Sequence, residues 1–229
     1  MTSATYVYQD IPCELDLIDL LDDLCIEPET EEAETLAGLV SQARALARPK
    51  VLFRECFIQN RQRDSLTIDG IPFQSKVLSA VLESAERVFP FVATCGRELD
   101  RIEVDPGDFL TKYWLETIKD RALSCSRRFL QVTIAELFGL SKASELSPGS
   151  GDASVWPLEQ QGLLFRLLGD VSGLIGVELT ESCLMIPTKT VSGIRFPTEV
   201  ELTSCQLCRR ADCPSRRAPF DRRLWESLH

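Results

Sequence analysis

The chain has 229 residues, of which 44% are hydrophobic and 26% are charged, a composition typical of a globular protein that buries a sizeable core. No apolar run reaches the length that spans a bilayer, and the N-terminus shows neither the basic start nor the apolar stretch of a secretory signal, so we expect a cytoplasmic protein without a membrane partner. The net charge of −10 argues against nucleic acid as a partner, because phosphate binding needs a basic footprint.

The negative charge is concentrated at the N-terminus. Residues 1–43 hold eleven Asp or Glu and no Lys or Arg, whereas the remaining chain holds 24 acidic and 25 basic residues. A solvated helical face accounts for such a run, and a docking surface for a basic partner is the alternative. Apolar residues at helical spacing predict a helical region over residues 13–48, broken near Pro28. Its second half is predicted to begin after Thr30, where acidic residues suit a helix N-terminus.

The middle of the chain mixes strand and helix patterns. Strands are predicted over residues 51–58 and 65–68, the second ending at the turn pair Asp69-Gly70. Ser75 is expected to cap a helix. The predicted apolar face of that helix consists of Val77, Leu78, Val81, Leu82, Ala85, Val88 and Phe89. A buried strand is then predicted over residues 91–94.

The longest periodic segment, residues 105–140, predicts a long helix with Pro106 in its first turn. One stripe of this helix is predicted to face the core, namely Leu110, Trp114, Ile118, Ala122, Cys125, Phe129 and Val132. A further helix is predicted from Trp156, and further strands over residues 176–179 and 191–196. Because helices and strands mix without strict βα alternation, the sequence indicates an α+β fold.

Three short segments in the second half of the chain carry a family resemblance. They are the turn Ser147-Pro148-Gly149, the segment Leu179-Thr180-Glu181-Ser182, and Val191-Ser192-Gly193 after Pro187. Together they resemble the reactivation domain of cobalamin-dependent methionine synthase, the module that returns an oxidised corrinoid to its working state. The resemblance extends, less sharply, from about Lys50 to Phe196. It implies a twisted antiparallel sheet with packed helices, and a cleft for S-adenosylmethionine or a corrinoid at Ser147, Pro148, Gly149, Glu181, Ser182, Ser192 and Gly193.

The resemblance divides the chain into three predicted parts. Residues 1–48 form an acidic helical region, residues 49–197 form the reactivation-domain-like core, and residues 198–229 form a Cys/Arg-rich tail. In the family, the turn reads Arg-x-Ala-x-Gly-Tyr and its Arg is implicated in holding the methionine carboxylate. Here Glu145 stands at the Arg position and Ser150 at the Tyr position. A carboxylate at this place repels another carboxylate, so the sequence argues against S-adenosylmethionine binding.

The chain also lacks a ligand for cobalt. It contains no Asp-x-His-x-x-Gly run, the signature by which corrinoid proteins of this group supply a lower axial ligand, and its single histidine is His229. We therefore expect the corrinoid to belong to another polypeptide, which would be a corrinoid protein or a cobalamin-dependent methyltransferase.

Nine cysteines without a secretory signal favour metal ligands over disulfides. Cys205, Cys208 and Cys213 follow the spacing Cys-x2-Cys-x4-Cys-Pro, which predicts a metal site in the tail. The all-sulfur ligand set favours an iron–sulfur cluster of the 4Fe–4S type. A fourth ligand would come from Cys183 or Cys95, and structural zinc is the main alternative.

These features lead to three hypotheses of function. The first is an accessory protein that reductively reactivates the corrinoid of a separate, methionine-synthase-like methyltransferase, with the tail cluster relaying the electron. The second is a non-redox module that docks on a cobalamin domain and holds structural zinc in its tail. The third is a reactivation domain that binds S-adenosylmethionine through backbone groups of residues 147–149. Whether the chain is a corrinoid reductase or a partner subunit of methionine synthase stays open.

Overall fold

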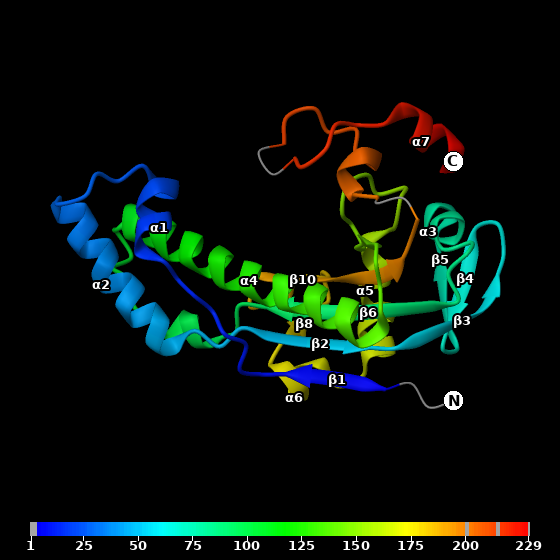
Figure 1. Ribbon diagram of the computed structural model, residues 1–229, viewed down its shortest axis with the longest axis horizontal. Helices are drawn as coiled ribbons and strands as arrows, with labels where there is room; N and C mark the ends of the chain where they lie inside the picture. Colours follow the sequence, from blue (N-terminus) through cyan, green and yellow to red (C-terminus); the bar gives the residue numbers. More distant parts are fainter. Residues whose placement is uncertain (1–3, 200–201, 214–215, 229) are drawn as a thin grey trace.

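A twisted antiparallel sheet with helices packed around it forms the body of the molecule (Figure 1). The computed structural model describes residues 4–199, 202–213 and 216–228, and their fold is α+β, as the sequence predicts. The sheet contains β1 (Thr5–Tyr8), β2 (Lys50–Arg54), β3 (Cys56–Arg61), β4 (Ser65–Ile68), β5 (Ile71–Gln74), β6 (Arg87–Thr94), β7 (Ala143–Leu146) and β10 (Thr190–Pro197). A separate small hairpin pairs β8 (Glu178–Leu179) with β9 (Met185–Ile186).

Strand β6 is the centre of the sheet. Its Thr94 lies opposite Lys50 of β2 on one edge and opposite Thr190 of β10 on the other. Further along β6, Val88 pairs with Cys56 of β3, which leads into the meander β3-β4-β5. On the other side β10 also pairs with β7, so the site-bearing segments after β7 and within β10 are neighbours in space. Because β6 is covered on both faces, its sequence is apolar at successive positions from Val88 to Ala93 and does not alternate.

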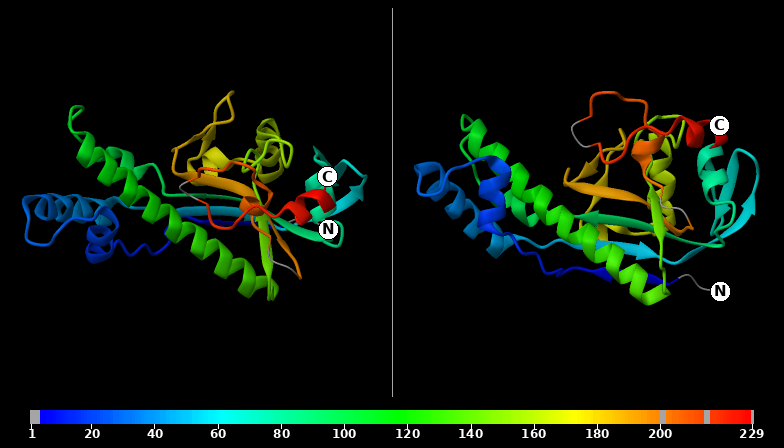
Figure 2. Two further views of the ribbon diagram at one scale, coloured as in Figure 1. Left: turned by 90° about the horizontal axis from the view of Figure 1, so that it is seen from above. Right: turned by 45° about the horizontal axis from the view of Figure 1, so that its top comes forward.

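Alternate residues of the central strands face two different layers, as the strand period of two requires. One face packs against α4 (Phe109–Phe138), which runs diagonally across the sheet in Figures 1 and 2. The residues of this layer are Val51, Phe53, Phe89, Phe91 and Ala93 of the sheet with Leu130 and Ile134 of α4. On the opposite face, Leu52, Val88 and Val92 belong to a cluster with α5 (Gln161–Leu168) and α6 (Val171–Ile175).

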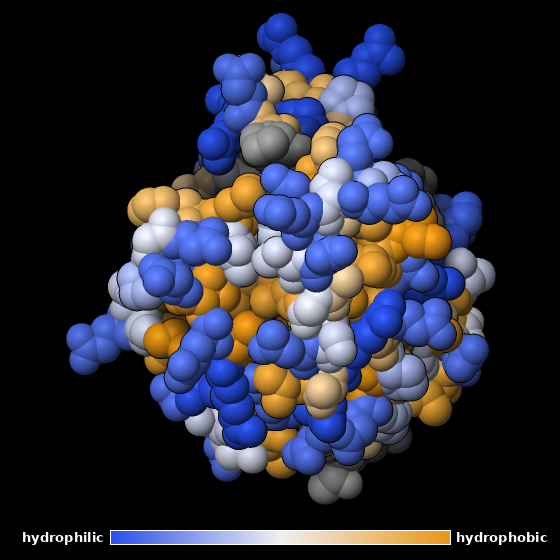
Figure 3. Space-filling view, turned by 90° about the vertical axis from the view of Figure 1, so that its left-hand side faces the viewer, coloured by the Kyte–Doolittle hydropathy of each residue, from blue (hydrophilic) through white to orange (hydrophobic). Residues whose placement is uncertain are grey.

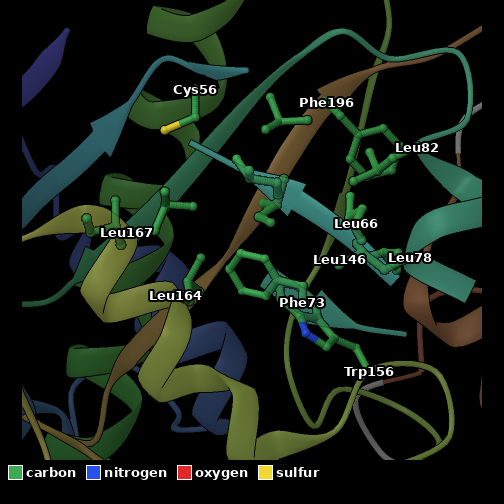
Figure 4. Close-up of a cluster of buried hydrophobic side chains, with 14 of the residues drawn as sticks. Cys56, Leu66, Phe73, Leu78, Leu82, Leu146, Trp156, Leu164, Leu167 and Phe196 are labelled. Carbon is green, nitrogen blue, oxygen red and sulfur yellow. The ribbon is translucent and has the colours of Figure 1, made fainter. Parts of the chain in front are cut away.

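The α5 layer extends under the meander (Figure 4). Trp156, which is fully buried, meets Phe73 of β5 edge to face at a centroid distance of 5.9 Å. Leu164 and Leu167 of α5 complete this part of the core. Such aromatic contacts add to the burial of large apolar side chains, and they fix α5 and the loop that precedes it.

A helical extension continues beyond the sheet. α1 (Leu17–Leu24) and α2 (Glu31–Leu46) pack against the first half of α4 and the short 3-10 helix η1 (Glu98–Arg101), burying Leu36, Leu99, Trp114 and Ile118 among others. Figure 3 shows this end of the molecule, where apolar patches lie among hydrophilic side chains. Exposed hydrophobic side chains of α1 and the start of α4 include Ile18, Phe109, Leu110 and Tyr113.

The C-terminal tail returns to the core rather than leaving the fold. It contains η3 (Ser204–Leu207) and α7 (Arg222–Leu228), and its Leu207 and Trp225 are buried in the same cluster as α5. The guanidinium of Arg209 stacks over the Trp225 ring at 4.1 Å. None of the helices in the described part of the chain combines the length and the apolar character needed to cross a bilayer.

Most predicted elements are present, although the single strand predicted over residues 51–58 is two strands, β2 and β3. Two further predictions are wrong. Thr30 and Ser75 cap α2 and α3 (Lys76–Val81), as expected. The predicted extension of α3 to Phe89 is wrong, because the chain leaves the helix after Val81 and residues 87–94 form β6. The predicted stripe of α4 is wrong at both ends. Its members Leu110 and Val132 are 53% and 47% exposed. Strands β1, β5, β7 and β9 and helices η1, α6, η3 and α7 were not predicted by the sequence patterns.

Candidate functional site

A cavity of about 360 Å³ lies where the end of β7, strand β10 and the C-terminal tail meet. Its volume falls within the usual range of small-molecule sites. It is lined by Ser147, Pro148 and Ser150 after β7, by Thr190, Val191 and Ser192 of β10, by Arg127, Glu145, Gln161 and Met185, and by Leu202, Thr203, Ser204, Cys205 and Arg217 of the tail. Two of the three family-like segments therefore meet at one cavity, although they lie more than forty residues apart in the sequence.

Two glycines allow the segments of the cavity wall to approach one another closely. A Cβ on Gly193 of β10 would come within 2.5 Å of the Leu146 carbonyl oxygen and 2.7 Å of the Ser147 Oγ, so only glycine allows this approach. Gly149 adopts a φ of 69°, and a Cβ there would meet Leu158 at 2.9 Å. The Gly149 N–H donates to the Trp156 carbonyl at 2.8 Å. The predicted site residues Gly149 and Gly193 thus shape the wall and do not line the cavity.

The charge around Glu145 differs from the negative charge that the sequence predicts for this place. Glu145 Oε1 accepts a hydrogen bond from Arg127 Nη2 of α4 at 2.5 Å, and its Oε2 lies 3.6 Å from Arg195 Nη1 of β10. All three side chains are at most 24% exposed. Two guanidinium groups against one carboxylate leave the group with a net positive charge, which attracts anions. The repulsion predicted from Glu145 alone is therefore offset by Arg127 and Arg195.

An unsatisfied donor lies in the wall of the cavity. Gln161, in the first turn of α5, is 3% exposed, and its Nε2 has no hydrogen-bond partner among the described residues. The preceding Gln160, by contrast, is tied to the backbone of Gln74 through both ends of its amide, with Oε1 accepting at 2.8 Å. Because a buried amide without a partner costs free energy, Gln161 is suited to donate to a molecule in the cavity.

The third family-like segment does not reach the cavity wall. Glu181 and Ser182 are exposed at the turn between β8 and β9, where the Thr180 and Ser182 hydroxyl groups lie 3.0 Å apart. Met185 of the same hairpin does line the cavity. The predicted role of Glu181 and Ser182 in the cleft is therefore not supported by their position, whereas the hairpin itself borders the cleft.

In the tail, an arginine rather than a metal-ligand cluster organises the cysteine segment. Arg216 donates to the carbonyl oxygens of Cys205 and Cys208, each at 3.2 Å, and to that of Ala218 at 3.1 Å. The backbone N–H of Arg216 donates to the Cys213 carbonyl oxygen at 3.1 Å. Within the part of the chain that the structure describes, no three His, Cys, Asp or Glu side chains are arranged to hold a metal ion. As arranged, the tail residues do not fit the predicted iron–sulfur or zinc site.

The two cysteines considered as a fourth ligand have structural surroundings of their own. Cys95 is fully buried in the cluster of α2 and α4, and burial raises the pKa of its thiol to about 12. The tail packs against the other cluster, around α5. Cys183 occupies the turn of the β8–β9 hairpin with a φ of 62°, and its N–H donates to the Thr180 carbonyl at 3.0 Å.

Sequence reasoning missed Arg127, Arg195 and Gln161. Arg127 lies on a helix whose neighbouring residue is also an arginine, and no local pattern distinguishes the two. Arg127 can be recognised as a site residue only once β7, which carries Glu145, and α4 are placed beside each other. Cys205, which the sequence predicts as a metal ligand, lies in the cavity wall, with its Sγ 3.4 Å from the backbone nitrogen of Arg217.

Comparison with known proteins finds a similar fold among solved structures. No protein-family model matches the chain, and no curated protein matches it. Among solved structures, the fold is similar to a crystal structure described as the MetH reactivation domain bound to AdoHcy, with a TM-score of 0.58 and 16% sequence identity. The match covers 88% of this chain and 81% of that chain. The chain therefore shares the fold of that reactivation domain.

Proposed function

We propose that this chain is a reactivation-domain-like module that binds an adenosyl sulfur compound and works on the corrinoid of a separate cobalamin protein. The observation that carries the proposal is the cavity bounded by Ser147, Pro148 and Ser192, in a fold similar to a domain solved with AdoHcy. A separate corrinoid protein is proposed because the chain lacks the histidine motif that would ligate cobalt.

The polar groups of the cavity suit the amino-acid end of such a ligand. Arg127 supplies a guanidinium for the carboxylate, and Gln161 supplies a free buried donor. Charge-assisted pairing of a guanidinium with a carboxylate is among the stronger polar interactions. In this proposal the ligand carboxylate competes with Glu145 for Arg127, so Arg127 takes over the task of the arginine that the turn lacks.

Calorimetric titration with AdoHcy tests the ligand. Arg127→Met removes the guanidinium proposed for the ligand carboxylate and leaves Glu145 with Arg195 alone, so we expect affinity to fall roughly 10- to 100-fold. Glu145→Gln removes the competitor and should tighten binding several-fold. Gln161→Leu should weaken binding roughly fivefold or more through the lost hydrogen bond. The matched protein control is Arg128→Met, because Arg128 is exposed on the same helix.

A second ligand separates the carboxylate effect from general damage to the cavity. Methylthioadenosine keeps the adenosyl sulfur group and lacks the amino-acid part. Its affinity should be unchanged by Arg127→Met and by Glu145→Gln. Absence of AdoHcy binding at millimolar concentration would remove the ligand part of the proposal.

The surface beside the cavity offers a place for the partner. Leu184 and Ile186 are 63% and 42% exposed, and they flank Met185 in the hairpin that borders the cavity. Adjacent exposed apolar side chains are typical of protein–protein contacts. The salt bridge between Lys189 and Asp120 fastens the chain after this hairpin to α4. We propose that the hairpin contacts the cobalamin protein.

Association and reactivation can be measured with the cobalamin domain of a methionine synthase that lacks its own reactivation region. The wild-type protein should bind it and, given reductant and S-adenosylmethionine, convert the Co(II) absorbance to that of methylcobalamin. Leu184→Asp should weaken association by tenfold or more. Leu137→Asp is the control, because Leu137 is also exposed and lies about 25 Å along α4 from the Asp120 contact. Binding without any spectral change would favour the non-redox docking module.

An electron relay through the tail stays a prediction. The assay is iron and zinc content of protein prepared without oxygen. With iron present, Cys208→Ser should abolish corrinoid reduction and leave the fold intact. With zinc present, the same variant should unfold the tail. Absence of both metals would discard the relay and the structural zinc together, and would leave the ligand cavity as the basis of function.

A further inference from the structure

Two cysteines that are distant in sequence meet between the N-terminal segment and the long helix. The Sγ atoms of Cys13 and Cys125 lie 3.0 Å apart across a sequence separation of 112 residues. Cys13 precedes α1 in an extended segment, and Cys125 lies in the middle of α4. Among the described residues, no other two cysteine sulfurs are in hydrogen-bond contact. A disulfide places its sulfurs about 2.05 Å apart, so closing this bond requires an approach of about 1 Å.

The backbone on both sides of the contact is held in place by other interactions. Arg44 of α2 donates to the Leu15 carbonyl through Nε at 2.9 Å and Nη2 at 2.7 Å, which fixes the segment just after Cys13. One turn before Cys125, Arg121 of α4 pairs with Asp23 of α1, with Nε donating at 2.8 Å. The two thiols are therefore brought together by the fold and do not depend on a mobile loop.

The contact also activates one of the two thiols. The pKa of Cys125 is lowered to about 7, first because the Cys13 thiol donates a hydrogen bond to its thiolate, against an opposing effect of burial. The backbone of Glu14 adds a second stabilising hydrogen bond, whereas the Glu14 carboxylate opposes it. The pKa of Cys13 is raised correspondingly by the same hydrogen bond and by burial. A thiolate with a half-buried thiol beside it is the arrangement of an attacking and a resolving cysteine.

We propose that Cys13 and Cys125 form a reversible disulfide by exchange with a low-molecular-weight disulfide of the glutathione type, and that this bond clasps the acidic N-terminal segment to α4. This inference is independent of the proposed ligand and partner. It assigns the pair to covalent redox modification, whereas Cys95, buried nearby in the same helical extension, keeps its proton because burial raises its pKa to about 12.

The exchange balances in two steps. The Cys125 thiolate attacks one sulfur of the small disulfide, forms a mixed disulfide and releases one small thiolate. Cys13 then loses its proton to solvent, and its sulfur attacks Cys125 Sγ, which releases the second small thiolate. The protein loses two electrons, the small disulfide gains them, and two protons end on the two small thiols. A dithiol reductant reverses the reaction.

The experiment uses the full chain, reduced and then equilibrated with glutathione mixtures of increasing oxidised fraction. After rapid alkylation at acidic pH, peptide mass mapping should find a Cys13–Cys125 cross-linked peptide as the main oxidised product. Cys13→Ser should trap glutathione on Cys125, because the resolving thiol is absent. Cys125→Ser should show at least a tenfold slower modification at Cys13. Cys25→Ser, at an exposed cysteine of the same region, should leave the cross-link unchanged.

The wild-type map alone keeps the test decisive if a variant fails to fold. Circular dichroism establishes that the oxidised protein retains the native fold. A folded wild-type protein without the cross-linked peptide at full oxidation overturns the proposal. So does a map in which Cys125 pairs equally with several other cysteines, because that pattern reports unfolding rather than a defined clasp.

Discussion

Replacing Gly193 by alanine tests whether the close approach of β10 to the turn after β7 shapes the fold and its cavity. A Cβ at this position would lie 2.5 Å from the Leu146 carbonyl oxygen and 2.7 Å from the Ser147 Oγ. Restoring ordinary contact to the backbone oxygen needs a shift of roughly 0.9 Å between two paired strands, and well-packed sites resist such shifts. By comparison with other overpacked cores, we expect a loss of about 2–3 kcal/mol in the free energy of unfolding.

Urea denaturation followed by circular dichroism measures this loss, and a thermal melt should show a decrease of roughly 5–10 °C in Tm. The matched control is Gly162→Ala in α5, where a Cβ meets nothing within 4 Å. That change should stabilise the protein by up to about 1 kcal/mol, because alanine favours a helix over glycine. If Gly193→Ala stays within about 0.5 kcal/mol of the wild type, the steric reasoning is refuted, together with the role given to this glycine in the cavity wall.

Three further predictions concern the helix register, the tail and the thiol pair. Leu130→Ala in α4 should cost about 3 kcal/mol in urea denaturation, whereas Val132→Ala, 47% exposed, should change stability by less than about 0.5 kcal/mol; equal effects would contradict the register of α4. Arg216→Ala should accelerate amide hydrogen exchange in residues 204–213 roughly tenfold or more, because the hydrogen bonds to the carbonyl groups are lost. The global stability should stay unchanged. Unaltered exchange would show that Arg216 does not organise the tail. Alkylation of Cys125 should rise with pH through a midpoint near 7 as the thiolate forms, and Cys13→Ala should move that midpoint upward; a midpoint above 8 in the wild type would contradict the pairing.

The α4 stripe shows what helical periodicity alone leaves undetermined. The sequence predicts a stripe that ends at Val132, whereas the buried residues advance in steps of four as Ile118, Ala122, Ser126, Leu130 and Ile134. Each such step turns the buried face by about 40° around the helix axis. The rotation follows the neighbours of α4, which change from α1 and α2 at its start to the sheet at its end. Tertiary contacts therefore set the register, and a serine lies on the buried side.

The boundary between α3 and β6 was mispredicted for a related reason. Val88 and Phe89 lie at helical spacing from Leu82 and Ala85, so the apolar pattern continues across the boundary. A strand covered on both faces has no alternation, and a short apolar run does not distinguish it from a buried helix. The fold class that the family resemblance implies is confirmed, and two of the three segments that carry the resemblance meet at one cavity. The charged and polar groups that complete the cavity, Arg127 and Gln161, come from elements that only the folded chain brings together.

The position of β10 has a consequence for how the protein is made. This strand fills the gap between β6 and β7, and it is the last strand of the sheet to leave the ribosome. Until residues 190–197 have emerged, β6 has one open edge, with backbone groups that can pair with other nascent chains. The pairing of β6 with β10 joins residues about a hundred positions apart. The sheet therefore stays incomplete during most of synthesis. Premature stop codons upstream of Thr190 should therefore yield aggregation-prone fragments rather than smaller folded proteins, and chaperone demand should be highest just before residues 190–197 emerge.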